Sequence, residues 1–315
     1  MYCCLLEIHV FEMLDTAAAD SVSAMSIKPL PDFTPVETWR DDFDSDAGDC
    51  ATIDYTDRRG ANSANTRKFW TTDIGDGTDG PGPGWGNDEM EYYTDDAVTT
   101  DGDGCLLITA ERTSDANGPA GWQESNRWKY VSGKITTANR VGFEYGLIEA
   151  RMQIPTEVGS WSAFWLLGES LLAGVSWPQC GEIDVLEAVG QEPASLLGTI
   201  HGPGYFGGEG LTRKIDHDGP LSDGFHIYSV LWLPDEIYWM FDGTAYHHLS
   251  AADAAPHEWV FNQRFYAILN LAMGGTLGGA LSDSVDRAQM RVDYVRHCAV
   301  VLAGSDDPIG SVTLH

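Results

Sequence analysis

The sequence has few basic residues and no long apolar run. Its 315 residues include 18 Lys and Arg against 48 Asp and Glu, which gives a formal net charge of −30 at pH 7. A surface this acidic repels phosphate, so nucleic acid is excluded as a partner. No stretch approaches the roughly 20 apolar residues that a membrane-spanning helix needs, so we expect no membrane partner. We expect a monomer.

Cysteine is also scarce, with six residues in the whole chain. So few cysteines do not form the disulfide framework of a small secreted domain, and no spacing between them is typical of a zinc site. Buried thiols and one or two disulfides both stay open. The six are Cys3, Cys4, Cys50, Cys105, Cys180 and Cys298.

The N-terminal segment lacks the basic region and the small-residue cleavage site of a secretory signal. Residues 1–36 show no sustained hydrophobic period and end in the proline-interrupted run SIKPLPDFTPVE. They predict a leader or a loosely ordered arm. We expect the compact domain over residues 37–305 and a C-terminal tail over residues 306–315.

Glycine and tryptophan are abundant, with 35 and 11 residues. Short runs rich in Val, Ile, Tyr and Trp alternate with clusters of Gly, Asp and Asn, a pattern typical of strands joined by turns. In residues 146–154, GLIEARMQI, apolar side chains such as Ile148 and Ala150 alternate with polar ones such as Glu149 and Arg151. This is the period of a half-buried strand. The sequence therefore predicts an all-β sandwich or barrel.

Three carboxylates lie close together in residues 177–190, WPQCGEIDVLEAVG. Glu182 and Asp184 share one face of a strand by its period of two. Glu187 is five positions beyond Glu182, so a regular strand would point it to the other face. One β-bulge between Asp184 and Glu187 would restore the parity and bring all three to one face. We predict that bulge.

The bulged segment would suit a retaining glycoside hydrolase. Four strand steps span about 13 Å, and two glutamate arms of roughly 4 Å that lean together leave about 5 Å between carboxyl groups, the separation expected for retention. Glu182 would then be the nucleophile. Glu187 would be the general acid and base, its pKa raised by neighbouring anions, and Asp184 would assist the nucleophile. The alternative is a solvated acidic strand edge.

The run GEIDVLE resembles the catalytic signature of glycoside hydrolase family 16 in its bulged form. Other segments follow in the order of that family and look like its laminarinase branch, over about residues 37–300. The chain departs from the usual pattern at Ser162, where proline is usual, and at Leu147, where arginine is common. The matching segments are WRDDFD at 39–44, GWGNDEMEYYT at 84–94, SGKITT at 132–137, YGLIEARMQIP at 145–155, WSAFWLLG at 161–168, HGPGY at 201–205, FHIYSVLW at 225–232, FYAILNLAMGG at 265–275 and VDYVR at 292–296.

The resemblance implies a β-jelly-roll sandwich with an open concave substrate cleft, and endo-hydrolysis of 1,3-β-glucan or mixed 1,3-1,4-β-glucan. Glu182, Asp184 and Glu187 match the nucleophile, the assisting aspartate and the acid and base. Trp177 corresponds to a sugar-stacking tryptophan, whose flat face suits a glucose ring. Asn87 matches a polar position that contacts glucose, and its alternative is a loop-capping side chain.

Four further residues are candidates with open alternatives. Trp161 and Trp165 would share a strand face and line the cleft or pack in a core. His201 would hydrogen-bond a carboxylate or a sugar hydroxyl, or be structural. The family often carries a structural calcium, for which Asp293 matches the carboxylate ligand. No cofactor is expected for catalysis.

Two other functions compete with the β-glucanase hypothesis. One is a non-catalytic β-glucan-binding protein, although such relatives generally lack the glutamate pair. The other is the same chemistry on agarose or carrageenan, although an acidic surface disfavours sulfated polymers. Because a polymeric glucan does not enter a cell intact, we expect the protein to be extracellular.

Overall fold

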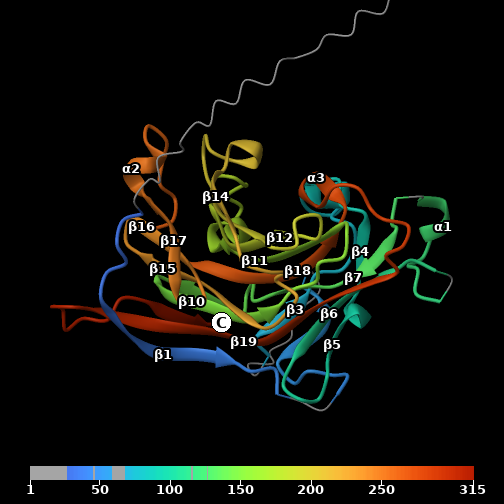
Figure 1. Cartoon of the computed structure of the whole chain (residues 1–315), viewed down its shortest axis with the longest axis horizontal. Coiled ribbons are helices and arrows are strands. Elements are labelled where there is room, and N and C mark those ends of the chain that lie inside the picture. The colour runs from blue at the N-terminus through green and yellow to red at the C-terminus, as the bar shows by residue number, and fades with distance from the viewer. Residues whose placement is uncertain (1–26, 45–46, 59–67, 115, 126) are drawn as a thin grey trace, which may run out of the picture.

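A computed structural model describes residues 27–44, 47–58, 68–114, 116–125 and 127–315 of the chain. These residues form two large sheets that are stacked as layers, with a few short helices at the periphery (Figure 1). The predicted all-β sandwich is confirmed.

The first sheet, which we call the β19 sheet, contains ten strands. Its strands are β1 (Phe33–Asp41), β4 (Glu91–Tyr93), β5 (Val98–Thr100), β6 (Leu106–Arg112), β7 (Tyr130–Ser132), β10 (Gly146–Gln153), β15 (His226–Leu233), β16 (Glu236–Phe241), β17 (Thr244–Ser250) and β19 (Arg287–Leu302). Eight of them run in the order β17-β16-β15-β10-β19-β6-β7-β4, while β1 pairs with β19 and β5 pairs with β6.

The second sheet, which we call the β12 sheet, also contains ten strands. Its strands are β2 (Ile53–Asp57), β3 (Trp70–Thr72), β8 (Lys134–Thr136), β9 (Val141–Glu144), β11 (Ser160–Gly168), β12 (Glu182–Val189), β13 (Ser195–His201), β14 (Leu211–Asp216), β18 (Phe265–Met273) and β20 (Ser311–Leu314). Eight run in the order β14-β13-β12-β11-β18-β8-β3-β2, and β9 joins β18 to β20.

Helices are short throughout the described residues. The α-helices are α1 (Trp122–Ser125), α2 (Ala251–Ala254) and α3 (Gly275–Gly278), and the 3-10 helices are η2 (Pro83–Gly86), η3 (Asp95–Ala97), η4 (Glu169–Ala173) and η5 (Gly207–Glu209). Within the described part of the chain, no helix has the length and apolar character needed to span a membrane.

The core lies between the two sheets, and strand alternation decides which side chains enter it. On β10, Ile148, Ala150 and Met152 are fully buried in the main cluster, as the period predicts. The other face of β10 is also covered near Glu149, which accepts hydrogen bonds from Tyr294 Oη at 2.8 Å and from Arg296 Nε at 2.7 Å. The predicted alternation is therefore confirmed, although part of its polar face is buried by ion pairing.

Strands lie on both sides of the predicted domain limits in the described part of the chain. Strand β1 begins at Phe33, inside the predicted arm, and pairs with β19 from Leu302 back to Val295. The predicted tail contains β20, which pairs with β9. Edge strands are held by backbone hydrogen bonds, and Pro35 is tolerated on β1 because that strand has one neighbour, so neither segment shows a clear side-chain period. Residues 1–26 lie outside the described residues.

Four of the six cysteines are described, and all four are buried free thiols. For Cys50, Cys105, Cys180 and Cys298, the alternative of buried thiols is therefore the correct one. Cys3 and Cys4 lie outside the described residues.

Candidate active site

The strand β12 contains the predicted bulge. Against β13, Asp184 lies opposite Thr199 and Glu187 lies opposite Leu197, so three steps along β12 match two steps along β13. Against β11, Asp184 and Leu186 lie opposite adjacent residues, which leaves Val185 as the extra residue. The bulge predicted from the spacing of the carboxylates is confirmed.

The bulge brings the three carboxylates to one face of the β12 sheet, which we call the catalytic face. Glu182, Asp184 and Glu187 lie opposite alternate positions of β11, namely Leu167, Trp165 and Ala163. The extra residue, Val185, is buried in the core between the sheets. The bulge leaves one residue of β12 unpaired in the ladder, so Glu182 and Glu187, five positions apart, face the same side.

Two tryptophans donate hydrogen bonds to the two glutamates. The indole of Trp177 donates from Nε1 to Glu182 Oε2 at 2.8 Å. The indole of Trp161 donates from Nε1 to Glu187 Oε1 at 3.1 Å. Each glutamate thus has one oriented oxygen, and both indoles lie beside the carboxylate pair, as their predicted roles require.

His201 lies directly opposite Glu182 on β13 and reaches the same group of acids. Its Nε2 is 3.4 Å from Asp184 Oδ2 and 3.9 Å from Glu182 Oε1. Among the described residues, Asp184 Oδ2 and His201 Nδ1 are buried without a hydrogen-bond partner. Unpartnered buried polar atoms beside a carboxylate pair are places for water or a sugar hydroxyl.

Burial raises the pKa of all three carboxyl groups. The pKa of Glu182 lies well above its ordinary value because of burial and then the charge of Asp184, and the pKa of Asp184 is raised by burial and then by Glu187. The pKa of Glu187 is raised by burial, while His201 and the Trp161 indole lower it. Burial, rather than the neighbouring anions of our prediction, is therefore the main cause at Glu187. Burial and mutual repulsion both oppose ionisation of all three groups at once.

Asn87 is tied into a network that ends on the β12 sheet. Its Nδ2 donates to Glu89 Oε1 at 3.1 Å, and Tyr93 Oη donates to Glu89 Oε2 at 3.2 Å. Asn270 Nδ2 donates to Tyr93 Oη at 3.1 Å, and Trp165 Nε1 donates to Asn270 Oδ1 at 2.8 Å. The network links the loop around Asn87 to the strand neighbouring β12.

Sequence reasoning missed Glu89, Tyr93, Asn270 and Lys134. Lys134 is buried with its ammonium 3.9 Å from the centroid of the Trp85 ring and 5.2 Å from that of Trp165. One signal was present for Asn270, which is the single polar side chain in the run FYAILNLAM. The others carry no local signal because their contacts join distant segments.

Trp161 and Trp165 share the β11 face, as predicted. Its ring packs with Val189 and Ala272 in a small cluster, and its Nε1 also reaches Glu187. Trp177, in contrast, is 41% exposed.

Asp293 lies on β19 in the other sheet. Its Oδ2 is 2.6 Å from Arg151 Nη1, so its carboxylate already has a cationic partner. Among the described residues, the group of three side chains close enough to share a metal ion is Glu182, Asp184 and His201. Asp293 is not part of that group, and its carboxylate pairs with Arg151 as it stands.

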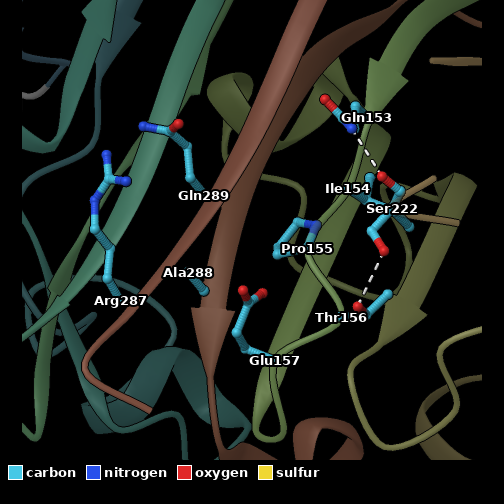
Figure 2. A pocket seen from close by; sticks show the side chains of 9 residues that line it. All are labelled: Gln153, Ile154, Pro155, Thr156, Glu157, Ser222, Arg287, Ala288 and Gln289. Atoms are coloured by element: carbon cyan, nitrogen blue, oxygen red, sulfur yellow. Dashed lines mark hydrogen bonds between the residues drawn. The ribbon is translucent and has the colours of Figure 1, made fainter. Parts of the chain in front are cut away.

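A hollow of about 330 Å³ is lined by none of the three carboxyl groups on β12 (Figure 2). It contains one carboxylate, that of Glu157, and its hydrogen bonds join Gln153 and Thr156 to Ser222. No candidate catalytic residue lines it, and a lone carboxylate does not supply two-carboxylate chemistry. Its lining residues are Gln153, Ile154, Pro155, Thr156, Glu157, Ser222, Arg287, Ala288 and Gln289.

A β-sandwich with two glutamates and an aspartate on one bulged strand defines a carbohydrate-cleaving enzyme that works through paired carboxyl groups. Comparison with known sequences makes the class specific. The chain belongs to the glycosyl hydrolases family 16, whose sequence profile matches residues 85–296. It is a glycoside hydrolase, and the family needs no cofactor for catalysis.

Several relatives are similar over most of this chain. It is 34% identical to the "Beta-glucanase" of Rhodothermus marinus over 238 residues, covering 72% of this chain and 78% of the relative. It is 36% identical to "Glucan endo-1,3-beta-glucosidase A1" of Niallia circulans over 230 residues, covering 68% of this chain and 32% of that relative. The chain thus spans about a third of the second relative.

Solved structures show the same fold. The laminarinase catalytic domain of Thermotoga maritima MSB8 matches with a TM-score of 0.70 and 36% identity, covering 84% of this chain and 98% of that one. The endo-β-1,3-glucanase of Pyrococcus furiosus matches with a TM-score of 0.71 and 34% identity, covering 87% and 100%. These matches confirm the predicted jelly-roll class.

Proposed function

We propose that the protein is a retaining endo-β-glucanase that cuts internal 1,3-β bonds, or mixed 1,3-1,4-β bonds, of laminarin-like polysaccharides. The observation that carries this proposal is the bulge at Val185, which turns Glu182 and Glu187 to one face of the sheet. The names of the relatives, a β-glucanase and an endo-1,3-β-glucosidase, support the same substrate class.

The first step is attack by Glu182 on the anomeric carbon. The carboxylate forms an ester with that carbon while the glycosidic C–O bond breaks, and Glu187 gives its proton to the leaving oxygen. The Trp177 indole holds Glu182 Oε2, so Oε1 is the oxygen left to attack. Burial raises the pKa of Glu187 and keeps its proton available.

The second step releases the product. Glu187, now ionised, takes a proton from water, and the water oxygen attacks the anomeric carbon and displaces Glu182. Two inversions give net retention of the β configuration. Asp184 lies between the glutamates. Burial and then the charge of Asp184 raise the pKa of Glu182, so a proton on Asp184 would favour the ionised nucleophile.

We assign sugar binding to the residues around the three carboxyl groups. Trp177 is exposed beside Glu182 and offers a flat apolar face to a glucose ring. Trp161 and His201 border the carboxylates, and Asn87 reaches the sheet through Glu89. We propose that these four residues line the open cleft that the family resemblance implies.

A panel of polysaccharides tests the substrate. We expect release of reducing ends from laminarin or lichenan, with internal cuts visible as early oligosaccharide products of several sizes. Release from agarose or carrageenan alone would assign the same chemistry to another polymer. A folded protein that releases nothing from any of them would be a glucan-binding protein, which the presence of both glutamates argues against.

The location and the oligomeric state of the enzyme are also proposals. Since a glucan polymer stays outside the cell, we propose that the protein is extracellular and monomeric. Fractionation of the producing cells, with activity assayed in medium and lysate, tests the first point, and size-exclusion chromatography tests the second. Activity confined to the lysate would contradict export.

A structural calcium at Asp293 stays a prediction. Binding would require Asp293 to exchange its contact with Arg151 for the ion, with further oxygens from the backbone. Thermal melting with and without a chelator tests it, because a resident ion stabilises the folded state by its binding free energy. An unchanged melting temperature would argue against a bound calcium ion.

A further inference from the structure

Two exposed aromatic rings meet beside the proposed nucleophile. Trp177 and Phe206 are 41% and 44% exposed, and both are among the large apolar side chains that the described surface leaves open. Their ring centroids are 5.5 Å apart and their planes meet at 81°. Because Trp177 also donates to Glu182, this pair is continuous with the catalytic face.

The loop holds Phe206 in place although its ring is exposed. Gly202 and Tyr205 exchange two backbone hydrogen bonds, of 2.9 and 3.1 Å, which close a tight turn just before it. Tyr205 is buried, and its hydroxyl donates to the backbone carbonyl of Glu258 at 2.8 Å. The exposed ring is thus presented by an anchored turn.

We propose that Trp177 and Phe206 form a corner platform that binds two successive glucosyl residues and selects curved 1,3-β-linked chain over flat 1,4-β-linked chain. Sugars that stack on the two rings must be turned relative to each other by a large angle. Successive rings of a 1,3-β-glucan turn relative to each other along a curved, helical chain, whereas those of a 1,4-β-glucan form a flat ribbon. This inference rests on the proposed function and deepens it.

The test compares Phe206→Ala with the wild-type enzyme on laminarin and on lichenan. We expect kcat/KM on laminarin to fall about tenfold and kcat/KM on lichenan to fall less than about twofold, the loss expected when one apolar stacking contact is removed. Phe206→Trp should retain the preference for laminarin. Val36→Ala, at an exposed apolar position on β1, is the control for a general surface effect.

The outcomes separate this inference from the proposed function. A wild-type enzyme without activity on either glucan would contradict the proposed function itself. The corner platform alone would be overturned if the wild-type enzyme is active and Phe206→Ala keeps its kcat/KM on laminarin. It would also be overturned if kcat/KM falls equally on laminarin and lichenan. Equal melting temperatures of variant and wild type exclude misfolding as the cause.

A second, independent observation concerns the bulge itself. Trp239, on β16 of the other sheet, is fully buried, and its Nε1 donates to the backbone carbonyl of Asp184 at 2.8 Å. That carbonyl lies at the start of the interruption in the β12–β13 ladder. A buried carbonyl without a partner is costly, so a donor from across the core stabilises the bulged conformation.

Gly198 makes room for this donor. It lies on β13 between Leu197 and Thr199, the residues opposite Glu187 and Asp184. A Cβ atom at Gly198 would be 2.4 Å from Trp239 Cδ1 and 2.7 Å from the Tyr246 hydroxyl oxygen. The indole therefore occupies space that any other residue at this position would fill.

We infer that Trp239 is a positioning residue that fixes the relative placement of Glu182 and Glu187 through the bulge. Trp239→Phe removes the donor and keeps most of the ring. We expect kcat to fall about 10- to 100-fold, KM to change less than about twofold, and the pH profile of kcat to shift, because misplaced reacting groups lose that much rate. Gly198→Ala should act in the same direction.

Trp232→Phe is the matched control. Trp232 is also fully buried, and its Nε1 donates to a backbone carbonyl, that of Phe261, at 3.0 Å. We expect the melting temperature to fall by a similar amount in both variants. Trp232→Phe should keep the pH profile of the wild type, with a kcat within about threefold of the wild-type value. A Trp239→Phe variant with wild-type kcat, or an equal loss of kcat in both variants, would overturn the positioning role.

Discussion

At the scale of single residues, the chemistry depends on where the protons lie. The reaction needs Glu187 protonated and Glu182 ionised, yet burial raises the pKa of both. The hydrogen bond from Trp177 and the proximity of His201 favour the ionised form of Glu182. His201 and the Trp161 indole act in the same direction on the pKa of Glu187, so the position of each glutamate on β12, rather than its pKa, distinguishes the two roles.

Glu182→Gln should lose nearly all turnover, about 10³-fold or more, while it still binds oligosaccharide, because the amide keeps the shape but cannot form the glycosyl ester. Initial rates on laminarin and calorimetric binding of a laminari-oligosaccharide measure the two effects. Glu209→Gln, the same change at an exposed position, should keep its rate. Wild-type turnover in Glu182→Gln would exclude this residue as the nucleophile.

The same variant should also be more stable at neutral pH. A carboxyl group whose pKa is raised on folding contributes stability that is present below its unfolded pKa, near 4.5, and is lost as the pH rises through its folded pKa. Glutamine removes this loss. Scanning calorimetry should show a melting temperature about 2–4 °C above wild type at pH 7, with the difference shrinking toward pH 4. Equal curves at both pH values would contradict a buried carboxyl with a raised pKa.

Glu187→Ala should be rescued by azide. The variant can still form the glycosyl-enzyme from a substrate with a good leaving group, and azide then attacks the face that water would use. We expect a β-glycosyl azide, detected by NMR. An α-configured azide would assign the nucleophile to another residue.

At the scale of elements, the spacing of the carboxylates along one strand was enough to predict the bulge. The hydrogen bond that stabilises the bulge could not be predicted. Trp239 and Asp184 are 55 positions apart and come from different sheets. The sequence likewise gave no measure of burial, so the main cause of the raised pKa of Glu187 was misassigned. Local period predicts which face a side chain takes, whereas tertiary packing decides what it meets there.

A buried carboxyl group between β4 and β18 leads to a second prediction about the pH dependence of stability. Glu91 is fully buried, its Oε2 accepts a hydrogen bond from the Met273 backbone N–H at 2.8 Å, and burial followed by the charge of Glu89 raises its pKa well above the ordinary value. Stability from this group is present at acid pH and lost as the pH rises. Glu91→Gln should therefore flatten the fall of melting temperature between pH 5 and pH 8. Parallel curves for variant and wild type would contradict this.

At the scale of the whole molecule, the net charge of −30 acts on the compact state. Like charges repel across the surface, and salt screens this repulsion over a Debye length of about 8 Å at physiological ionic strength. The melting temperature should rise by a few degrees between dilute buffer and about 1 M NaCl. No change would show that surface repulsion costs the folded state little.

Backbone pairing extends the sandwich on both sides of the predicted domain limits. Strands β1 and β20 close two edges of the sandwich through backbone pairing with β19 and β9. Such edges carry no hydrophobic period, because one face of each strand and one row of backbone groups remain toward solvent.

The central claim is that one bulge brings two glutamates to a single anomeric carbon for a double displacement. Proton NMR of the wild-type enzyme cutting laminari-oligosaccharides tests it most directly, by following which anomer of the new reducing end forms first. The account predicts that the β anomer appears first and then mutarotates to the equilibrium mixture. First appearance of the α anomer would mean a single inversion and would contradict the account.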